Sequence, residues 1–315
     1  MSLKLMKPPI NLDKYKVTFE DTQRVIEFEE LADDYDAYID GGHRIKGAKL
    51  IWGATHDVVS FEGGVVTLWA GYTSHGKSLL LGQACIGFAA QGEKVCIASL
   101  EMPPLDTYKR LIKQAAQNEK PSKEFNREFS AWLNDKVIAF DYVGNITPSK
   151  MLQIVQYAAG EHGVKHFVID NLMKCVRGED DYNGQKDFIN DLQTLASLLN
   201  IHIHVVAHLR KGGGDGEIPT MDFVKGSSAM IQMVQQVLIV HRNMKKVILL
   251  EKAHATNDQV ELEKIRTMPD ARLIIAKNRN GNGDGAIPLW FDPKSMQYRA
   301  QQRFATLDLM EWTAK

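Results

Sequence analysis

From residue 51 onward, the chain alternates short apolar segments with longer segments in which apolar and polar residues mix. Short segments rich in Val, Ile and aromatic residues are typical of buried strands. The predicted strands are 65–70, 94–100, 136–142, 165–170, 202–207, 236–241, 272–277 and 287–291. The predicted helices are 77–91, 105–117, 148–161 and 186–199. This alternation predicts an α/β fold with a mainly parallel, twisted sheet and helices on both of its faces.

Some segments depart from this alternation. The strands after residue 200 follow one another without long helices between them, which predicts an antiparallel edge of the sheet. Residues 211–217 and 280–285 are glycine-rich and unpatterned. Residues 244–271 are charged, with a helical pattern near Val260 to Ile265, so we expect a surface excursion there.

The beginning of the chain follows another pattern. Residues 1–24 are polar and show no sustained period, so we expect an arm. In residues 25–40, apolar residues recur at steps of three and four among acidic ones, which predicts an amphipathic helix. Such a helix could pack on its own domain or dock, as a linker, on a neighbouring subunit. The expected division is an arm and linker helix over 1–50, the main domain over 51–300 and a C-terminal tail over 301–315.

Composition narrows the classes of function. The 315 residues carry a net charge of −1, which argues against a monomer that coats DNA but not against a ring with a basic channel. The three cysteines, Cys85, Cys96 and Cys175, form no C-x-x-C pair, so neither a zinc ribbon nor a disulfide framework is expected. Without a membrane-spanning apolar run or a signal peptide, we expect a cytoplasmic protein with no membrane partner.

The most specific motif follows the strand 65–70. Residues 71–78 are Gly-Tyr-Thr-Ser-His-Gly-Lys-Ser and match the phosphate-binding pattern G-x-x-x-x-G-K-[ST] between a strand and a helix. The backbone N–H groups of such a loop bind polyphosphate, the lysine reaches the β- and γ-phosphates, and the serine holds Mg²⁺. The predicted nucleotide-binding residues here are Gly71, Ser74, His75, Gly76, Lys77, Ser78 and Leu79, with Ser78 also a metal ligand.

Acidic residues follow two of the other predicted strands. Ligands in open α/β sheets bind beyond the carboxyl ends of the strands. Glu101 follows strand 94–100 and could orient the attacking water, or it could simply offset a helix dipole. Asp170 ends strand 165–170, as the Mg²⁺-binding acid of a Walker B strand does, although acids at strand ends are common.

Further candidates lie at later strand ends. His208 could bond the γ-phosphate or be an ordinary strand-terminal histidine. His202 and His204 share one face of their strand, and we expect packing or solvent contact, not a metal site. Lys277 and Arg279 point the same way and could stabilise a transferring phosphoryl group, or form a solvated basic turn.

Together these motifs resemble the helicase domain of hexameric replicative DNA helicases, the RecA-like superfamily of the bacterial DnaB type, phage primase-helicases and Twinkle. The similarity runs from about residue 50 to 295. It is carried by the phosphate loop 71–78, Ser99-Leu-Glu-Met102, Phe167-Val-Ile-Asp170, Val205-Val-Ala-His-Leu-Arg210, Lys225-Gly-Ser-Ser-Ala-Met-Ile-Gln232 and Ala276-Lys-Asn-Arg-Asn-Gly281. The phosphate loop alone indicates an NTPase, whereas the Ser-Leu-Glu-Met and Lys-x-Arg-x-Gly segments are more specific.

The resemblance implies roles for the catalytic candidates. It makes Glu101 the general base, Asp170 the Mg²⁺-binding acid and His208 the γ-phosphate sensor. Lys277 and Arg279 would act in trans on the nucleotide of a neighbouring subunit. The main domain would be a RecA-like NTPase/helicase domain.

The resemblance also implies contacts with the base and with DNA. Arg242 and Phe291 fall where relatives hold the nucleotide base. Segments 172–186 and 209–226 resemble the loops that line the channel of the ring. The basic residues they offer for DNA phosphates are Lys174, Arg177, Lys186, Arg210, Lys211 and Lys225.

The sequence departs from the family pattern in places. Gln232 lies in the fourth motif, but Gln235 stands where relatives usually carry an acid. Asp215 and Glu217 in the second channel loop put its DNA contacts in doubt. No primase zinc motif precedes the domain, so either a primase half never existed or the chain is a fragment.

The favoured function is an NTP-driven replicative DNA helicase domain that translocates on single-stranded DNA as a ring, 5′→3′ by resemblance. It would use ATP or dTTP with Mg²⁺, assemble as a homo-oligomer, a hexameric ring, and work with a primase domain or protein in a bacterium or phage-infected host. A RecA-fold recombination ATPase that forms filaments is an alternative. A KaiC-like regulatory ring that does not act on DNA is another, and the near-neutral charge favours it.

Overall fold

The computed structural model describes residues 28–40, 47–178, 180–210, 218–226, 228–279, 285–302 and 305–313. The chain divides into two compact units, Met1–Arg44 and Ile45–Lys315. In the first unit, a 3-10 turn (η2, Phe28–Leu31) leads into α2 (Ala32–Asp40), which confirms the predicted helix over its described residues. The predicted arm, residues 1–24, and most of both glycine-rich segments lie outside the described residues.

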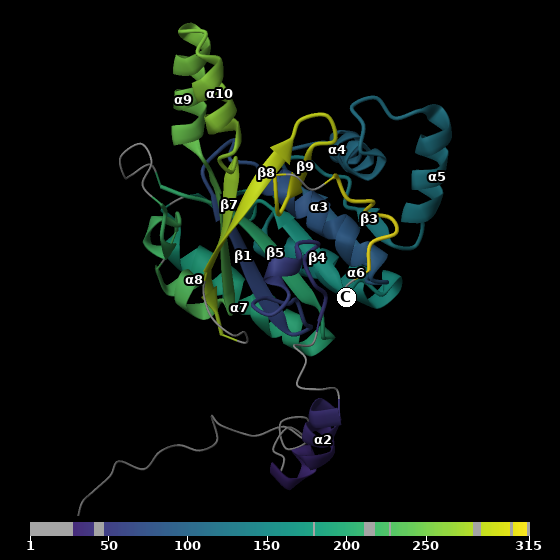
Figure 1. The fold of residues 1–315 in the computed structure, drawn as a ribbon. Coiled ribbons are helices and arrows are strands. Elements are labelled where there is room, and N and C mark those ends of the chain that lie inside the picture. The colour runs from purple at the N-terminus through teal and green to yellow at the C-terminus, as the bar shows by residue number, and fades with distance from the viewer. Residues whose placement is uncertain are drawn as a thin grey trace, which may run out of the picture. The chain divides into compact units, whose positions relative to one another are not determined.

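The second unit is built on a nine-stranded sheet in the order β3-β2-β4-β5-β1-β6-β7-β8-β9 (Figure 1). The strands are β1 (Val65–Gly71), β2 (Val95–Ser99), β3 (Val137–Ala139), β4 (His166–Asp170), β5 (His202–His208), β6 (Gln236–Arg242), β7 (Ala271–Asn278), β8 (Gly285–Asp292) and β9 (Gln297–Arg299). Neighbours from β3 to β6 in this order pair parallel, whereas β6–β7, β7–β8 and β8–β9 pair antiparallel. Both the mainly parallel sheet and its antiparallel edge are therefore confirmed.

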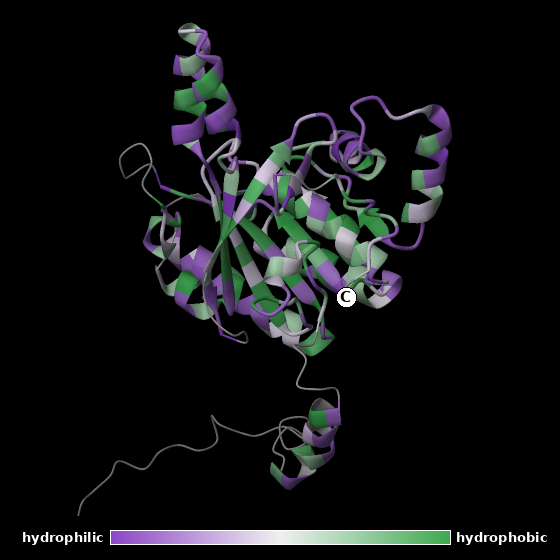
Figure 2. Ribbon diagram, in the orientation of Figure 1, coloured by the Kyte–Doolittle hydropathy of each residue, from purple (hydrophilic) through white to green (hydrophobic). Residues whose placement is uncertain are grey.

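Helices cover both faces of the sheet. They are α3 (Lys77–Ala90), α4 (Pro104–Ala116), α5 (Lys123–Leu133), α6 (Pro148–His162), α7 (Tyr182–Leu199) and α8 (Ser228–Met233), with 3-10 turns η3 (Gly53–Thr55), η4 (Leu172–Lys174) and η5 (Met221–Phe223). One core joins the sheet to α3, α4 and α5, and the other joins it to α6, α7 and α8. Because side chains alternate across a strand, Trp69 of β1 belongs to the first core and Leu68 to the second. In Figure 2, green predominates in the central strands, whereas the helices that cover the sheet carry both green and purple residues.

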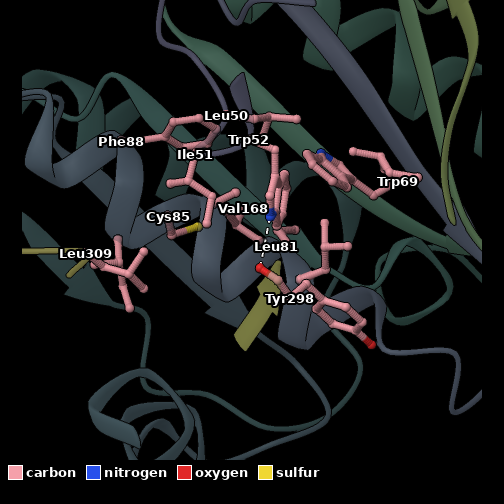
Figure 3. Packing of buried hydrophobic residues seen from close by; sticks show 14 of the residues in the cluster. Leu50, Ile51, Trp52, Trp69, Leu81, Cys85, Phe88, Val168, Tyr298 and Leu309 are labelled. Carbon is pink, nitrogen blue, oxygen red and sulfur yellow. Dashed lines mark hydrogen bonds between the residues drawn. The ribbon is translucent and has the colours of Figure 1, made fainter. Parts of the chain in front are cut away.

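Segments from both ends of this unit lock α3 in place (Figure 3). The indole of Trp52 donates to the carbonyl of Tyr298 at 2.9 Å. Gln83 of α3 donates to the same carbonyl at 3.1 Å and accepts from the amide of Tyr298 at 2.8 Å. Leu309 is fully buried in the same core. These contacts fix β9, and with it Tyr298, beside the start of α3.

Some predicted elements were wrong in extent or missed. The strand predicted over 136–142 is only β3, a half-exposed edge strand. The helix predicted from 186 begins earlier because Asp181 caps it, accepting from the amide of Gly184. Helix α5, whose N-terminus Ser122 caps, was not predicted, and neither were α8 and β9. These short elements carry weak periodic signals and depend on packing against the sheet.

The segment 244–271 is a helical hairpin, α9 (Met244–Ala255) and α10 (Gln259–Arg266), which confirms the excursion and its helical pattern. The hairpin stands away from the sheet in Figure 1 and has a small core of its own, centred on Ala253, Leu262 and Ile265. At its stem, Lys246 forms a 2.7 Å ion pair with Asp270. Within the described ranges, none of the helices is both long and apolar enough to cross a membrane.

Candidate nucleotide site

The register of the parallel strands brings the predicted strand-end residues to one edge of the sheet. Gly71 of β1 lies opposite His208 of β5, and Ser99 of β2 lies opposite Asp170 of β4. This edge opens into a cavity of about 360 Å³ that is lined by the phosphate loop and by predicted catalytic residues. Those that line it include Lys77, Ser78, Glu101, Asp170 and His208. The structure therefore brings these sequence-predicted residues together.

The phosphate loop has a conformation that requires glycine. Gly76, just before α3, has a φ of +88°, and a Cβ there would collide with the hydroxyl of Tyr298. The ring of His75 accepts a hydrogen bond from the backbone amide of Arg242 at 3.0 Å, which ties the loop to the end of β6. Burial, followed by the charges of His241, Lys77 and Arg242, lowers the pKa of His75 to about 4, so its ring stays a neutral acceptor.

The side chain of Lys77 contacts the backbone at the start of the phosphate loop. Its side-chain nitrogen donates to the carbonyls of Gly71 and Tyr72, both at 2.9 Å, and lies 3.3 Å from Nδ1 of His208. Burial lowers the pKa of Lys77 to about 8, although Asp170 and Glu101 oppose the shift. An anion bound in this cavity would favour the charged ammonium.

Ser78 and Asp170 fit a magnesium site. The Ser78 hydroxyl hydrogen-bonds the Asp170 carboxylate, so both oxygens lie at one point of the cavity wall. Burial raises the pKa of Asp170, which a cation at this point would reverse. Mg²⁺ is usually bound by one or two carboxylates together with substrate phosphates and water. Arg110 of α4 lines the same cavity and favours the ionised form of Asp170.

A buried amide joins two of the predicted catalytic residues. Asn171, only 1% exposed, donates from Nδ2 to Oε1 of Glu101 at 2.7 Å. The same Nδ2 lies 3.2 Å from Nε2 of His208. Glu101 is itself exposed, so this contact fixes the direction of its carboxylate.

A second cavity, of about 440 Å³, adjoins the first and shares Ser74, Gly76 and Leu79 with it. Arg242 and Phe291, the predicted base contacts, both line it. A nucleotide whose phosphates occupy the loop could therefore place its base here. The remaining walls come from Tyr298 and from the face of α9 that carries Val247, Glu251 and His254.

Lys277 and Arg279 lie at the opposite edge of the sheet from the phosphate loop. Lys277 pairs with Val237 near the start of β6, whereas the far end of β6 contacts the loop. Because β6 spans seven residues, its two ends lie about 20 Å apart. The side chains of Lys277 and Arg279 both donate to the carbonyl of Gln232, each at 2.8 Å. They therefore sit together, but away from the nucleotide site of their own chain.

Contacts between its two ends close the second predicted channel loop, 209–226. Leu209 and Val224 form an isolated antiparallel bridge, which brings Arg210 beside the segment that carries Lys225. Arg210 donates to the carbonyl of Gly226 at 2.9 Å.

Gln185, in the first turn of α7, donates to the carbonyl of Gly178 at 3.0 Å, and its side-chain oxygen lies against Gly226. Gln185 thus links the two loops. Of the predicted DNA contacts, Arg177, Lys186 and Arg210 are exposed, Lys174 and Lys225 are half-buried, and Lys211 lies outside the described residues.

Arg110, Tyr298 and Asn171 contribute to the site but were not predicted. Arg110 is one cation among several on an amphipathic helix, so no local signal marks it. Tyr298 belongs to a strand too short to predict. Asn171 could have been found, because it directly follows Asp170 at the end of a predicted strand, where ligand-binding residues are expected.

Taken together, the fold and this site define a RecA-like domain with a phosphate loop. Residues 57–300 match the family described as DnaB-like helicase C terminal domain. Because the match spans most of the sequence, the chain belongs to this family, and the resemblance inferred from the motifs is confirmed. Membership favours a helicase over the filament-forming and regulatory alternatives.

Relatives and solved structures agree with this assignment. The Twinkle homolog protein, chloroplastic/mitochondrial, of Arabidopsis thaliana is 23% identical over 236 residues, which are 69% of this chain and 33% of that protein. The chain thus spans about a third of that relative's length. A DnaB-like replicative helicase, solved in a study of its interactions with primase, superposes with a TM-score of 0.69 at 16% identity, over 89% of this chain and 69% of that one. A second solved structure, of an isolated ATPase domain, gives 0.68 at 17% identity, over 86% and 96%. These two likenesses show the fold.

Proposed function

We propose that this chain is the motor domain of an NTP-driven replicative DNA helicase that translocates on single-stranded DNA as a ring of identical subunits. Family membership supports the helicase, and the cavity of the phosphate loop supports hydrolysis of ATP or dTTP. One observation carries the ring: Lys277 and Arg279 lie near the start of β6, whereas the other end of β6 contacts the phosphate loop of the same chain. Cations at that end of the sheet are placed for the nucleotide of a neighbouring subunit and not for that of their own chain.

In the proposed reaction, Glu101 takes a proton from a water molecule whose oxygen attacks the γ-phosphorus. The bond from that phosphorus to the bridging oxygen breaks, and the nucleoside diphosphate leaves. Lys77 offsets the charge on the β- and γ-phosphates, and His208 contacts the γ-phosphate. Ser78 and Asp170 would hold Mg²⁺, which supplies positive charge to the phosphate oxygens.

The basic residues of the two connected loops would bind the DNA backbone, and the primase partner stays a proposal from the family. The exposed apolar side chains Phe28, Leu31, Tyr35 and Ile39 support docking of the linker helix on a neighbouring subunit. A helix that instead stays unattached in the assembled ring would contradict this docking.

Mixing two inactive variants tests the shared site. Lys77→Ala removes the phosphate-loop lysine but keeps the cations, whereas Arg279→Ala keeps the loop but lacks a cation. In randomly mixed rings at equal ratio, about a quarter of the interfaces join an intact loop to an intact cation pair. We expect DNA-stimulated hydrolysis to recover to that extent. If mixing restores nothing, or if Arg279→Ala alone hydrolyses normally, the assignment in trans is wrong.

Unwinding itself requires a separate assay. Fork substrates with a 5′ or a 3′ tail, incubated with ATP or with dTTP, measure polarity and nucleotide preference together. We expect unwinding from the 5′-tailed strand. Helical filaments in electron micrographs, or hydrolysis that single-stranded DNA does not stimulate, would favour one of the two alternative functions.

A further inference from the structure

We propose that Asn171 is a positioning residue that sets the tautomer of His208 and the direction of Glu101, and so couples γ-phosphate recognition to water activation. The inference rests on the proposed nucleotide hydrolysis. The side-chain nitrogen of Asn171 contacts Glu101 and His208, and so joins two groups that are proposed to be catalytic.

The orientation of the Asn171 amide follows from Glu101. An ionised carboxylate only accepts hydrogen bonds, so the amide atom 2.7 Å from Oε1 of Glu101 must be the nitrogen. The reverse orientation would place the amide oxygen against the carboxylate oxygen at that distance. Asn171 is buried and cannot turn toward solvent to relieve such a contact. The carboxylate of Glu101 therefore fixes the amide.

The tautomer of His208 follows from the amide. The Nδ2 group of Asn171 faces Nε2 of His208 at 3.2 Å, and two donors cannot bond each other, so Nε2 accepts. A neutral imidazole has one donor and one acceptor, so Nδ1 carries the proton. The 3.3 Å contact between Nδ1 and the Lys77 ammonium then joins two donors. The ammonium of Lys77 can move away from Nδ1, because its side chain is flexible and already has two carbonyl acceptors at 2.9 Å.

These two donors define a place for an anionic oxygen. His208 and Lys77 both line the cavity where the γ-phosphate is proposed to bind. Once the ammonium of Lys77 moves away from its 3.3 Å contact with Nδ1, a phosphate oxygen can accept from both donors. At the same time, Asn171 occupies Oε1 of Glu101 and leaves Oε2 for a water molecule. One amide thus makes His208 a donor to the phosphate and aims the carboxylate that activates the water.

Asn171→Asp tests the inference, because it keeps the shape of the side chain and reverses its polarity. The aspartate would accept from Nε2–H of His208, moving the proton from Nδ1 to Nε2, and would repel Glu101. We expect hydrolysis to fall about 100-fold or more, since this is the scale of a misplaced general base. We also expect the preference for ATPγS over ADP to fall about tenfold, the scale of one lost charge-assisted bond. Asn190→Asp, an equal charge change on the exposed side of α7, should alter neither.

The tautomer itself can be observed without any turnover. Magic-angle-spinning NMR of sedimented protein labelled with ¹⁵N-histidine distinguishes protonated from unprotonated ring nitrogens, and His208→Gln assigns the signal. We expect Nδ1–H in the unsubstituted protein and Nε2–H in Asn171→Asp. An Nε2–H signal in the unsubstituted protein overturns the inference even if that protein hydrolyses ATP. If the protein hydrolyses no nucleotide, the proposed function fails, while the spectrum still decides the tautomer.

A second variant covers a failure of Asn171→Asp to fold. Asn171→Leu fills the buried site, adds no charge and removes both contacts. We expect at least a tenfold lower kcat with unchanged affinity for ADP, because Glu101 loses its direction while the phosphate loop stays intact. Hydrolysis at the unsubstituted rate in either variant would overturn the positioning role.

Discussion

Acidification should destabilise this protein from inside its sheet. His166 of β4 and His202 and His204 of β5 are almost completely buried and stack against one another and Phe88. Trp69 donates to Nδ1 of His204 at 3.1 Å, so the proton of His204 lies on Nε2, which donates to Nδ1 of His166 at 3.1 Å. Both accepting nitrogens are thus occupied, and protonating either one breaks a buried hydrogen bond.

The size of the effect follows from the linkage between protonation and folding. Burial lowers the pKa of His202 to about 4 and the pKa values of His166 and His204 well below 6.5. Below pH 6.5 these histidines therefore bind protons in the unfolded chain but not in the folded chain. Each of them then lowers the free energy of unfolding by up to about 1.4 kcal/mol per pH unit. Between pH 7 and pH 5 the loss is about 2 kcal/mol per histidine, or about 6 kcal/mol for the cluster of three, against a typical total of about 5–15 kcal/mol.

Urea unfolding at half-unit steps from pH 7.5 to pH 5 measures this loss directly. The slope of the unfolding free energy against pH gives the number of protons taken up, which we expect to fall by about one in His204→Gln. His162→Gln, at the exposed end of α6, should keep the slope of the unsubstituted protein. A change in stability below about 1 kcal/mol between pH 7 and pH 5, or an unaltered slope in His204→Gln, would refute the reasoning.

Two further substitutions test how the walls of the nucleotide cavities are held. Gly76→Ala should weaken nucleotide binding at least tenfold in a fluorescent-nucleotide titration, because it combines a positive φ with a collision at Tyr298. Gly160→Ala, where an added Cβ meets nothing, should bind normally, and equal affinities for the two variants would contradict the argument. Asp270→Asn should destabilise the hairpin stem by about 1–3 kcal/mol, because buried Lys246 loses its ion pair. Hydrogen exchange should then quicken in α9 and α10 but not in the central strands, and unchanged exchange in the hairpin would show that the ion pair does not hold it.

The features that could be predicted from the sequence are those that a short contiguous segment specifies. The phosphate loop is a contiguous motif, and Glu101, Asp170 and His208 each follow an apolar strand. Parallel strands bring their carboxyl ends to one edge, so locating the strands was enough to group these residues. The core position of His202 and His204 was only half predicted, because packing was one of two interpretations, and their hydrogen bonds could not be inferred from alternation alone. The buried position of His166 was not predicted.

The rest depends on contacts between distant segments. Asn243, Lys246 and Asp270 form the stem of the hairpin, with Asp270 also accepting from the amide of Phe291 at 2.9 Å. No periodicity relates these positions, so the sequence predicted an excursion but not that α9 would form a wall of the second cavity. Arg110 likewise reaches the phosphate cavity only because α4 packs on α3. Such neighbours become visible only once the strand order is known.

The change of strand direction at β6–β7 has a consequence for the proposed ring. Had β7 been parallel to β6, Lys277 and Arg279 would have ended beside the phosphate loop and could have served their own nucleotide. Because the pair is antiparallel, β6 carries Arg242 toward the loop while β7 carries the two cations back to the opposite edge. Their shared contact with the carbonyl of Gln232 holds them there as a unit. If the two cations act in trans as proposed, hydrolysis requires two chains, and any movement of α8 that displaces Gln232 would alter the site of a neighbour before its own. We therefore expect the contact between neighbouring subunits, more than the phosphate loop, to set how hydrolysis in one subunit depends on the next.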